Sequence, residues 1–404
     1  MKNFYFFALA SLGEGLSGSD RIFIELARNW GKKFPVNIFV WEEGRMMCDR
    51  QELEYSLAEY EKPVGIKLHL SNMKKWYRMG FLVCYFARVF EGIRLGLTLD
   101  LKNDPETYTY STNDFWMDIF PAVLLKLRFK KITWISSFYL AAPNPFIGFN
   151  ETGKAYYRLP NIKLILYWFQ QIPTYWLTRF LSDYVFVTSE PDRKRFPKQN
   201  SKSKVIVVKG GVRLKHLKRW RKKNPSVPRK YVAVFQGRFH PQKGVLELID
   251  IWKKVVRSLP EAKLAMIGDG ELMDKVKLKI DEYKLQKNIK LFGFMYDGPE
   301  KYMVFAQSKI VVHPAVYDSG GMAAAEAMAL GLPCVGFDLK AFETYYPQGM
   351  LKVESGNIDA FAEAIIRLNQ NATLFAKYRR DAVDLIMNHW SWIKKSDEIL
   401  KCLL

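Results

Sequence analysis

The chain has 404 residues, of which 49% are hydrophobic and 25% are charged. This composition excludes a disordered protein, and the length predicts two domains of roughly 150–200 residues each. The formal net charge of +21 favours anionic partners such as nucleotides, phospholipid headgroups or nucleic acid, and it indicates nothing about the fold. Cys48, Cys84, Cys334 and Cys402 have no metal-ligand spacing, which predicts a reducing compartment without a disulfide framework.

The amino terminus has two interpretations. Lys2 and the apolar run Phe4–Ala10 resemble a short signal peptide. The run is brief, and glycines follow it from Gly13 onward, which favours a first buried strand with its loop. We expect the strand. No stretch of the sequence approaches the ~20 apolar residues that a membrane-spanning helix needs.

Short apolar runs alternate with longer helical patterns along the chain. The first series of expected strands is Phe4–Phe7, Val36–Val40, Ile66–Leu70, Thr107–Ser111, Thr133–Ser136 and Tyr184–Thr188. The second series is Val205–Val208, Tyr231–Phe235, Lys263–Ile267, Lys290–Phe292, Lys309–His313 and Pro333–Phe337. Strand, helix and strand repeated in this way predict an α/β protein with parallel sheets covered on both faces.

A polar, basic stretch over residues 197–230 lies between the two series and is the expected boundary region. We therefore expect one domain over residues 1–200, a second over 201–375, and carboxy-terminal helices over 376–404. In open parallel sheets, ligands bind where strands end and glycine loops enter helices. Three such junctions carry the candidate chemistry.

The first junction runs from Gly13 to Asp20 and leads into an expected helix over Arg21–Trp30. Gly13, Gly15 and Gly18 fit the spacing of a dinucleotide-binding loop, but a single match is weak evidence because most strand-to-helix turns contain glycine. A phosphate-binding loop and an ordinary turn both remain open here.

The second junction follows an expected strand and contains Gly237, Arg238 and Lys243 before a helix begins at Val245. A guanidinium and an ammonium on one loop can converge on a diphosphate. The alternative is a pair of solvated surface cations. The position of the loop at the carboxyl end of a strand favours the diphosphate site.

The third junction contains Asp318, the pair Gly320-Gly321 and an alanine-rich helix that carries Glu326 and ends near Gly331. Backbone N–H groups at such a helix start can hold phosphate or sugar oxygens. A carboxylate in the helix suits hydroxyl groups, such as those of a ribose. Taken alone, each acid is better explained as a helix cap or a surface carboxylate than as a ligand-binding group.

Together the three junctions resemble those of the retaining glycosyltransferases of family four, the group 1 glycosyl transferases, which have the GT-B architecture. Gly237-Arg238 and Lys243-Gly244 match the family's diphosphate loop, and Gly268-Asp269-Gly270 matches its Gly-Asp-Gly. The family's most specific mark is two glutamates with seven residues between them. Glu326 matches the second, whereas Asp318 replaces the first with a side chain one methylene shorter.

This resemblance implies two Rossmann-like, doubly wound parallel-sheet domains that face each other, with the last helix returning to the amino-terminal domain. It implies a hexose-type transfer from a UDP- or GDP-linked donor, without a metal, to a glycan or lipid-linked acceptor in surface polysaccharide or glycolipid synthesis. Arg238, Lys243 and Asp318 become the expected catalytic residues. The expected donor-binding residues are these three together with Gly15, Gly18, Gly237, Gly268, Ser319, Gly320, Gly321, Met322 and Glu326.

The resemblance also implies a transfer in which the departing phosphate accepts the acceptor's proton, so that no protein base is needed. The amino-terminal half matches less well. Many relatives have a histidine after the strand that here reads Thr133–Ser136, and this chain has Ser137 and Phe138 there. Asn113, Asp114, Asp118 and Tyr139 are polar residues near strand ends that are more often structural.

Two aromatic and basic segments, residues 74–99 and 162–180, suit either helices at a lipid interface or core-facing helices with a solvated edge. The basic run from Arg213 to Lys223 is either a solvated connector or a further lipid contact. We expect a cytoplasmic protein that associates peripherally with the anionic inner face of the cell membrane. Rival functions are a GT-B-fold nucleotide-sugar epimerase or phosphorylase and, remotely, a nucleic-acid-binding protein, although no nucleic-acid-binding motif is present.

Overall fold

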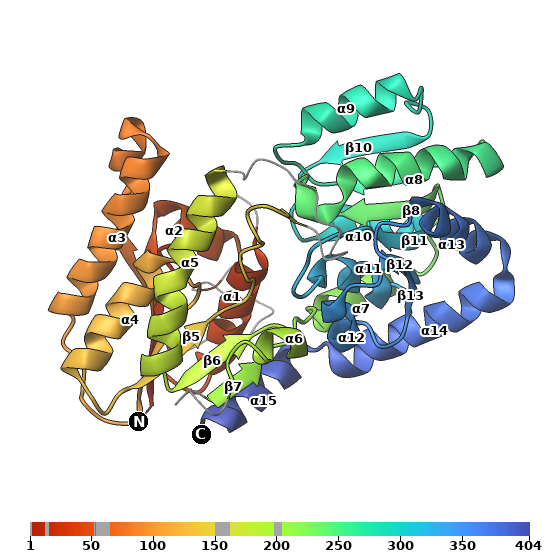
Figure 1. Ribbon diagram of the computed structural model, residues 1–404. Helices are drawn as coiled ribbons and strands as arrows, with labels where there is room; N and C mark the ends of the chain where they lie inside the picture. Colours follow the sequence, from red (N-terminus) through yellow and green to blue (C-terminus); the bar gives the residue numbers. More distant parts are fainter. Residues whose placement is uncertain (1, 13–15, 52, 54–64, 150–161, 198–203) are drawn as a thin grey trace. The chain divides into compact units, whose positions relative to one another are not determined.

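The computed structural model describes residues 2–12, 16–51, 53, 65–149, 162–197 and 204–404 (Figure 1). The described residues form two compact units. The first unit contains residues 2–145, 162–210 and 392–404 within the described ranges. The second contains residues 146–149 and 211–391. The chain therefore returns to its first unit for its last helix.

The first unit is built on a seven-stranded sheet with the order β3-β2-β1-β4-β5-β6-β7. Every pair of neighbouring strands is parallel. The strands are β1 (Asn3–Phe7), β2 (Val36–Trp41), β3 (Ile66–Ser71), β4 (Thr107–Ser111), β5 (Thr133–Ser137), β6 (Tyr184–Val187) and β7 (Lys204–Val207).

Helices cover both faces of this sheet, as buried parallel strands require. They are α1 (Gly18–Trp30), α2 (Glu42–Arg50), η1 (Lys74–Met79), α3 (Phe81–Thr98), α4 (Trp116–Arg128), α5 (Ile162–Leu181), α6 (Glu190–Arg193) and α15 (Trp392–Leu403). The last helix packs against α1, where the Trp30 indole donates to the carbonyl of Ser396 at 3.1 Å.

The helices α3, α4 and α5 form one layer (Figure 1). A Cβ on Gly92 of α3 would lie only 2.5 Å from the carbonyl oxygen of Met117 in α4, so glycine permits this close approach. On the other side of α4, the Trp116 indole donates to the carbonyl of Gln170 in α5 at 2.8 Å.

The second unit has a six-stranded parallel sheet with the order β10-β9-β8-β11-β12-β13. Its strands are β8 (Tyr231–Gln236), β9 (Leu264–Ile267), β10 (Ile289–Gly293), β11 (Ser308–His313), β12 (Cys334–Phe337) and β13 (Met350–Val353). Relabelled within the unit, this order is 3-2-1-4-5-6, the doubly wound Rossmann topology.

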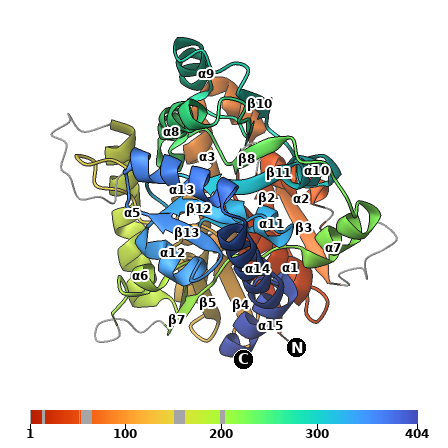
Figure 2. The ribbon, with the colours of Figure 1, turned by 90° about the vertical axis from the view of Figure 1, so that its right-hand side faces the viewer.

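The helices of the second unit are α7 (Leu214–Lys223), η3 (Pro241–Lys243), α8 (Val245–Ser258), α9 (Met273–Glu282), α10 (Pro299–Ala306), η4 (Met322–Ala324), α11 (Ala325–Ala329), α12 (Lys340–Tyr345), α13 (Ile358–Gln370) and α14 (Ala372–His389). Figure 2 shows α13 and α14 in front of the sheet. The amphipathic helix α8 buries Val245, Leu248, Ile249, Trp252 and Val255, a helical spacing that faces one side to the core.

The predicted strands occur in the structure, and each of their ends lies within one residue of the predicted position. One of them lies in the other sheet: Val205–Val208 was expected to open the second series, but β7 pairs with β6 and closes the first sheet. The strand β13 was not predicted, because Met350–Val353 has only four residues and three of them are half-exposed. The predicted alanine-rich helix is a single 3-10 turn, η4, followed by the five-residue α11.

Candidate active site

The strand order of the second sheet reverses between β8 and β11, and ligands of open parallel sheets bind at the carboxyl edge at such a point. The loop after β8 carries Gly237, Arg238 and Lys243, and the loop after β11 carries Asp318, Gly320 and Gly321. The topology thus brings the second and third junctions to one place. Gly244, with a φ of 63°, lets the loop after β8 approach the loop after β11 closely. A Cβ at this position would lie 1.9 Å from the carbonyl oxygen of Pro314.

A third loop, the one that follows β9, packs against the loop that follows β8. Gly268 donates its N–H to the Gly293 carbonyl at 2.8 Å, and Phe239 donates to the Asp269 carbonyl at 2.8 Å. Gly268 has a φ of 145°, and a Cβ would lie 1.9 Å from the carbonyl oxygen of Gly237. Glycine at this position therefore serves backbone packing under the Gly237-Arg238 turn.

Asp318 is the central carboxylate of the site, with 9% of its side chain exposed. Its Oδ2 forms an ion pair with Lys243 Nζ. Its Oδ1 accepts the backbone N–H groups of Gly320 at 3.1 Å and Gly321 at 3.0 Å. Burial alone would raise the pKa of Asp318, but the Lys243 charge and the neighbouring His313 outweigh it and hold the pKa well below its usual range.

His313, the last residue of β11, is a buried member of this cluster that the sequence analysis did not select. Its Nε2 lies 3.5 Å from Asp318 Oδ2, longer than a regular hydrogen bond. Burial lowers the pKa of His313, and the nearby carboxylate only partly offsets this. The imidazole is therefore neutral near pH 7. An apolar strand pattern hides such a residue, because Ile310, Val311 and Val312 precede it directly.

Glu326, the other acid of the third junction, is the second residue of α11 and is buried. Its Oε2 lies 2.5 Å from Nζ of Lys301, a lysine in α10 whose side chain has no exposed surface. Lys301 Nζ also pairs with Asp297. This lysine was not predicted from the sequence, although the four-residue spacing of Asp297 and Lys301 is the spacing of helical ion pairs.

Arg238 is exposed, whereas Lys243 is half-buried, and an aromatic cluster includes His240, two residues after Arg238. Phe149 packs edge-on against His240, with ring centroids 5.0 Å apart, and against Tyr317 at 5.6 Å. Phe149 precedes β6 in sequence by more than thirty positions, yet it belongs to the second unit. It thus adds an aromatic wall to the loops after β8 and β11 that sequence order could not reveal.

The first junction lies in the other unit. Gly15 lies outside the described residues, and Gly18 is the exposed first residue of α1. Helix α1 therefore begins three residues before the expected Arg21. Ser17 and Asp20 form a capping box at this start: Asp20 N–H donates to Ser17 Oγ at 3.2 Å, and Ser17 N–H donates to Asp20 Oδ2 at 3.0 Å.

Gly237, Lys243, Gly268, Asp318, Gly320 and Gly321 thus gather around the loops of the second unit, with Ser319 and Met322 in the same β11 loop. The N–H groups of Gly320 and Gly321, which were expected to hold donor oxygens, bond to Asp318 instead. Their role in donor binding stays a prediction.

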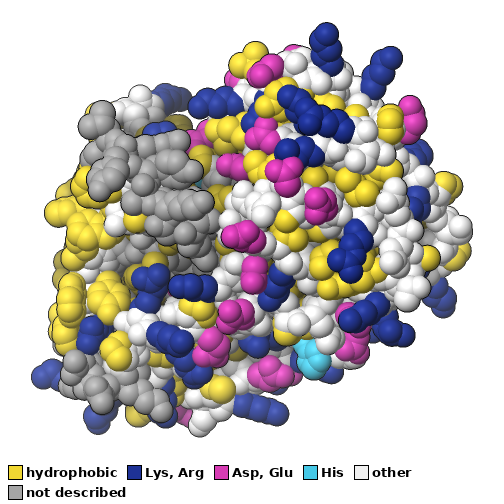
Figure 3. Space-filling view, turned by 45° about the vertical axis from the view of Figure 1, so that its right-hand side comes forward, with side chains coloured by type: hydrophobic (Ala, Val, Ile, Leu, Met, Phe, Trp, Pro, Cys, Tyr) yellow, Lys and Arg dark blue, Asp and Glu magenta, His cyan; other side chains and the backbone are white. Residues whose placement is uncertain are grey.

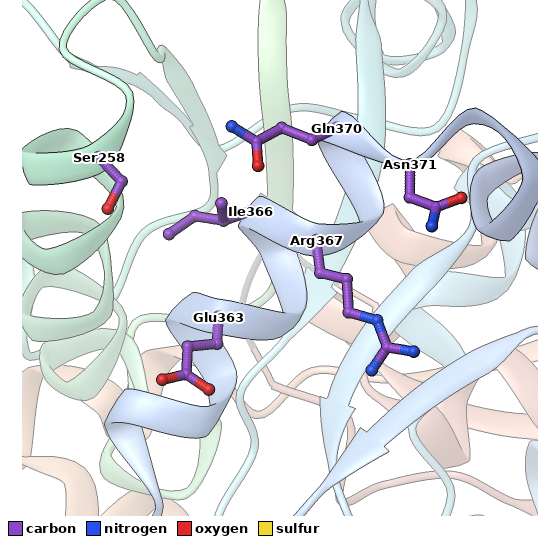
Figure 4. A pocket seen from close by; sticks show the side chains of 6 residues that line it. All are labelled: Ser258, Glu363, Ile366, Arg367, Gln370 and Asn371. Carbon is purple, nitrogen blue, oxygen red and sulfur yellow. The ribbon is translucent and has the colours of Figure 1, made fainter.

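A hollow lies at the edge of the second sheet opposite the loops after β8 and β11, and it does not contain the cation and glycine pattern of those loops. It is lined by Ser258, Glu363, Ile366, Arg367, Gln370 and Asn371 (Figure 4). Helices α8 and α13 both begin at the carboxyl edge, so their ends meet at the opposite edge. Within the described ranges, no three His, Cys, Asp or Glu side chains are grouped to hold a metal ion.

The positive charge has no single focus on the face drawn in Figure 3, where Lys and Arg side chains are scattered among Asp and Glu. Nucleic-acid-binding proteins gather such residues in a patch or stripe. Among the described helices, none is long and apolar enough to cross a membrane.

The chain has two Rossmann-like units, and the second carries Lys243 and the Gly320-Gly321 pair at its topological switch point. This architecture defines a protein of the GT-B fold. Solved structures agree. TarM of S. aureus, in a complex that contains UDP, superposes with a TM-score of 0.70 over 100% of both chains at 13% identity. Sucrose-phosphate synthase from Thermosynechococcus elongatus gives 0.69 over 100% of this chain and 98% of that one, at 15% identity.

The model of the family "Glycosyl transferases group 1" matches residues 217–383, which include every site residue of the second unit described above except Phe149. Similar proteins include the poly(glycerol-phosphate) alpha-glucosyltransferase of Bacillus subtilis, 29% identical over 38% of this chain and 23% of that protein. Another is the UDP-Gal:alpha-D-GlcNAc-diphosphoundecaprenol alpha-1,3-galactosyltransferase of Escherichia coli, 26% identical over 42% and 44%. Each match spans less than half of the relative's length. The resemblance to this family thus covers the second unit, which is less than half of the chain.

Proposed function

We propose that the protein is a retaining hexosyltransferase that transfers a sugar from a nucleotide diphosphate sugar to a glycan or lipid-linked acceptor. The observation that carries the proposal is the cluster of Lys243, Asp318, Gly320 and Gly321 at the switch point of the second sheet. The match of residues 217–383 to the glycosyl transferases group 1 model, and the UDP-sugar and lipid-linked substrates named for similar proteins, support it.

Each residue has a proposed role that follows from its chemistry. Arg238 and Lys243 stabilise the charge that develops on the departing diphosphate, because fixed cations at a partly dry site lower the energy of an anionic transition state. Lys243 pairs with Asp318, so a diphosphate must share or replace that partner. Asp318 then contacts the donor sugar, and Glu326 accepts hydrogen bonds from the ribose hydroxyls.

The first test is a thermal shift of the purified chain with UDP, GDP, ADP and their common sugars, repeated for Glu326→Gln. A ligand that binds only the folded state at about 100 times its Kd stabilises that state by about 2.7 kcal/mol. We expect one nucleotide to raise the melting temperature by several degrees and Glu326→Gln to abolish most of that rise. No shift with any member of the panel would contradict the proposal.

Glu363→Gln is the matched control for this substitution. Glu363 is exposed and lines the hollow on α13, at the edge of the sheet away from the donor loops. Its substitution should leave the nucleotide-induced rise in melting temperature unchanged.

A second experiment separates a transferase from an epimerase. A transferase releases the nucleotide only when an acceptor is added, whereas an epimerase leaves the nucleotide attached to the sugar.

We also propose that transfer needs no divalent metal, because Arg238 and Lys243 supply the positive charge that a metal would otherwise bring to the diphosphate. Activity should then be the same in EDTA and in magnesium. Loss of transfer in EDTA with recovery in magnesium would contradict this part of the proposal.

The acceptor side of the proposal rests on an unusual surface of the first unit. The exposed apolar residues of η1 and of the first halves of α3 and α5 form a surface that we call the apolar edge. They are Trp76, Tyr77, Met79, Phe81, Leu82, Val83, Phe86, Ile162, Ile165, Leu166, Trp168 and Phe169. In a parallel sheet with helical crossovers, α3 and α5 both begin at the carboxyl edge. Their apolar starts therefore lie at one end of the α3-α4-α5 layer (Figure 1).

Soluble proteins seldom leave large apolar side chains exposed in such a group without a partner. Lys74, Lys75 and Arg78 are exposed beside the apolar edge, and cations beside aromatic residues suit the interface of an anionic bilayer. We propose that this edge rests on the cytoplasmic leaflet of the cell membrane, where a lipid-linked acceptor would be reached.

Sedimentation with phosphatidylglycerol vesicles tests this surface. The double variant Leu82→Glu with Phe169→Glu should weaken binding at least about tenfold, since burying one large apolar side chain contributes about 1.5–3 kcal/mol. Leu278→Glu is the control, because Leu278 is 69% exposed on α9 of the second unit. Equal binding of the double variant and the control would exclude the apolar edge.

A further inference from the structure

Lys301 is an unusual residue for its position. The residues around it in α10 that face the core are Tyr302, Val304 and Phe305, and Lys301 is as buried as they are. Removing an ammonium group from water is costly unless carboxylates replace the lost hydration. A lysine buried here therefore requires partners, and it has two.

Those partners come from different parts of the donor unit. Asp297 lies in the loop between β10 and α10, and Glu326 lies in α11. Lys301 Nζ pairs with both, at 2.5 Å from Oε2 of Glu326. The three side chains form a buried chain of charge, Asp297–Lys301–Glu326, that joins the β10 loop to the carboxylate expected at the ribose.

The carboxylate of Glu326, in α11, is tied to a cation that comes from another helix, α10. Glu326 is the second of the five residues of α11, and 9% of its side chain is exposed. Holding a flexible glutamate in one rotamer costs about 1.5–2 kcal/mol of side-chain entropy. An ammonium bonded to one oxygen sets the direction of the other.

We propose that Lys301 is a positioning residue that aims the Glu326 carboxylate at the hydroxyl groups of the donor's ribose, and that Asp297 anchors Lys301 from the β10 loop. A carboxylate can accept about four hydrogen bonds, so the bond to Lys301 leaves capacity for hydroxyl donors. Two acids against one lysine also leave the group with an excess negative charge, which suits hydroxyls and repels phosphate. The inference rests on the proposed use of a nucleotide donor.

The experiment compares a nucleotide with its deoxy form, because a purely structural lysine would not affect that comparison. Calorimetry with UDP and 2′-deoxyUDP, and with GDP and 2′-deoxyGDP, gives the preference for ribose. We expect the wild type to prefer the ribonucleotide about tenfold, the scale of one charge-assisted hydrogen bond. Lys301→Met should reduce the preference to about threefold or less.

Further variants guard against misfolding of Lys301→Met, which leaves two buried acids without their cation. Replacing all three charged groups, in Lys301→Met with Glu326→Gln and Asp297→Asn, removes both unpaired charges and should fold, because exchanging buried paired groups for neutral groups of similar shape is nearly neutral. It should show the same low preference as Glu326→Gln alone. Asp297→Asn keeps the Lys301–Glu326 bond and should show an intermediate preference.

Lys279→Met is the matched control. Lys279 pairs with Asp250 at 2.6 Å on helices α8 and α9, and it is largely buried. That variant should keep the full ribose preference. If Lys301→Met lowers the melting temperature but keeps the preference, the inference is overturned and the proposed function stands. If the wild type binds none of the four nucleotides, the inference about Lys301 and the proposed function are both overturned.

Discussion

Asp118 is a fully buried acid at the carboxyl end of the first sheet. Its Oδ1 accepts the backbone N–H groups of Leu9 at 2.7 Å and Ala10 at 3.1 Å, just past β1. Its Oδ2 lies 3.2 Å from the hydroxyl of Thr112, just past β4. Asp118 therefore joins the two loops at the switch point of the first sheet, which makes it a structural residue, one of the two roles that its sequence position allowed.

The titration of Asp118 gives a testable pH dependence. Burial raises its pKa to about 8, against the opposing hydrogen bonds. Because the unfolded value is about 3.9, the folded state holds a proton between these limits that the unfolded state has lost. Its contribution to stability is complete below pH 4 and is lost as the pH rises towards 8, by at most about 1.4 kcal/mol per pH unit.

Asp118→Asn should remove this dependence, because its amide oxygen can still accept from Leu9 and Ala10. We expect the stability of the wild type relative to the variant to fall between pH 5 and pH 8. Urea unfolding of both proteins at these two pH values measures the difference. A constant difference would show that Asp118 is ionised throughout.

Among the loops and short elements, the turn after β9 contains Gly268, a position where the backbone conformation and the space available require glycine. Gly268→Ala would place a methyl group 1.9 Å from the carbonyl of Gly237, at a φ of 145°. Gly293→Ala is the control, because Gly293 also has a positive φ, 70°, but no atom lies within 4 Å of its Cβ position.

We expect Gly293→Ala to lower the free energy of unfolding by about 1–2 kcal/mol through backbone strain alone. Gly268→Ala should cost about 1–3 kcal/mol more through overpacking. It should also weaken nucleotide binding, since the displaced loop carries Arg238. Equal stabilities of the two variants, measured by urea unfolding, would contradict this account of the turn.

The return of the chain to its first unit at Trp392 affects the whole molecule. Helix α15 packs on α1, and besides the Trp30 bond to Ser396, the Tyr108 hydroxyl donates to the Leu403 carbonyl at 3.3 Å. Deleting residues 392–404 should therefore destabilise the first unit and leave nucleotide binding by the second unit intact.

Calorimetric unfolding with and without nucleotide would measure both effects of the truncation. The nucleotide-sensitive transition should persist, and the other should move to lower temperature. Leu400→Ala, at a buried position of α15, is a milder version that should cost about 2–5 kcal/mol. Unchanged melting of both variants would mean that α15 contributes little to the first unit.

The amino-acid sequence was sufficient for the fold class and for the resemblance of the second unit to the glycosyl transferases group 1 family. Buried parallel strands are continuous apolar runs, so their period and spacing are visible without a structure, as are Gly237-Arg238, Gly268 and the acids at 318 and 326. Each of these features depends on a short stretch of chain. Buried strands require apolar side chains, and tight turns require glycine, so the residue types themselves show where these elements are. The alternation of strand and helix then restricts the topology to a few forms.

Only the tertiary structure decided which residues meet. The pairing of β7 with β6, the position of Phe149 beside His240, and the partners of Lys301 all depend on contacts between distant parts of the chain. An apolar pattern cannot show that His313 ends a strand beside a carboxylate, nor that a lysine lies in the core. Such polar groups are tolerated only because distant residues compensate their desolvation, and sequence spacing does not record those partners.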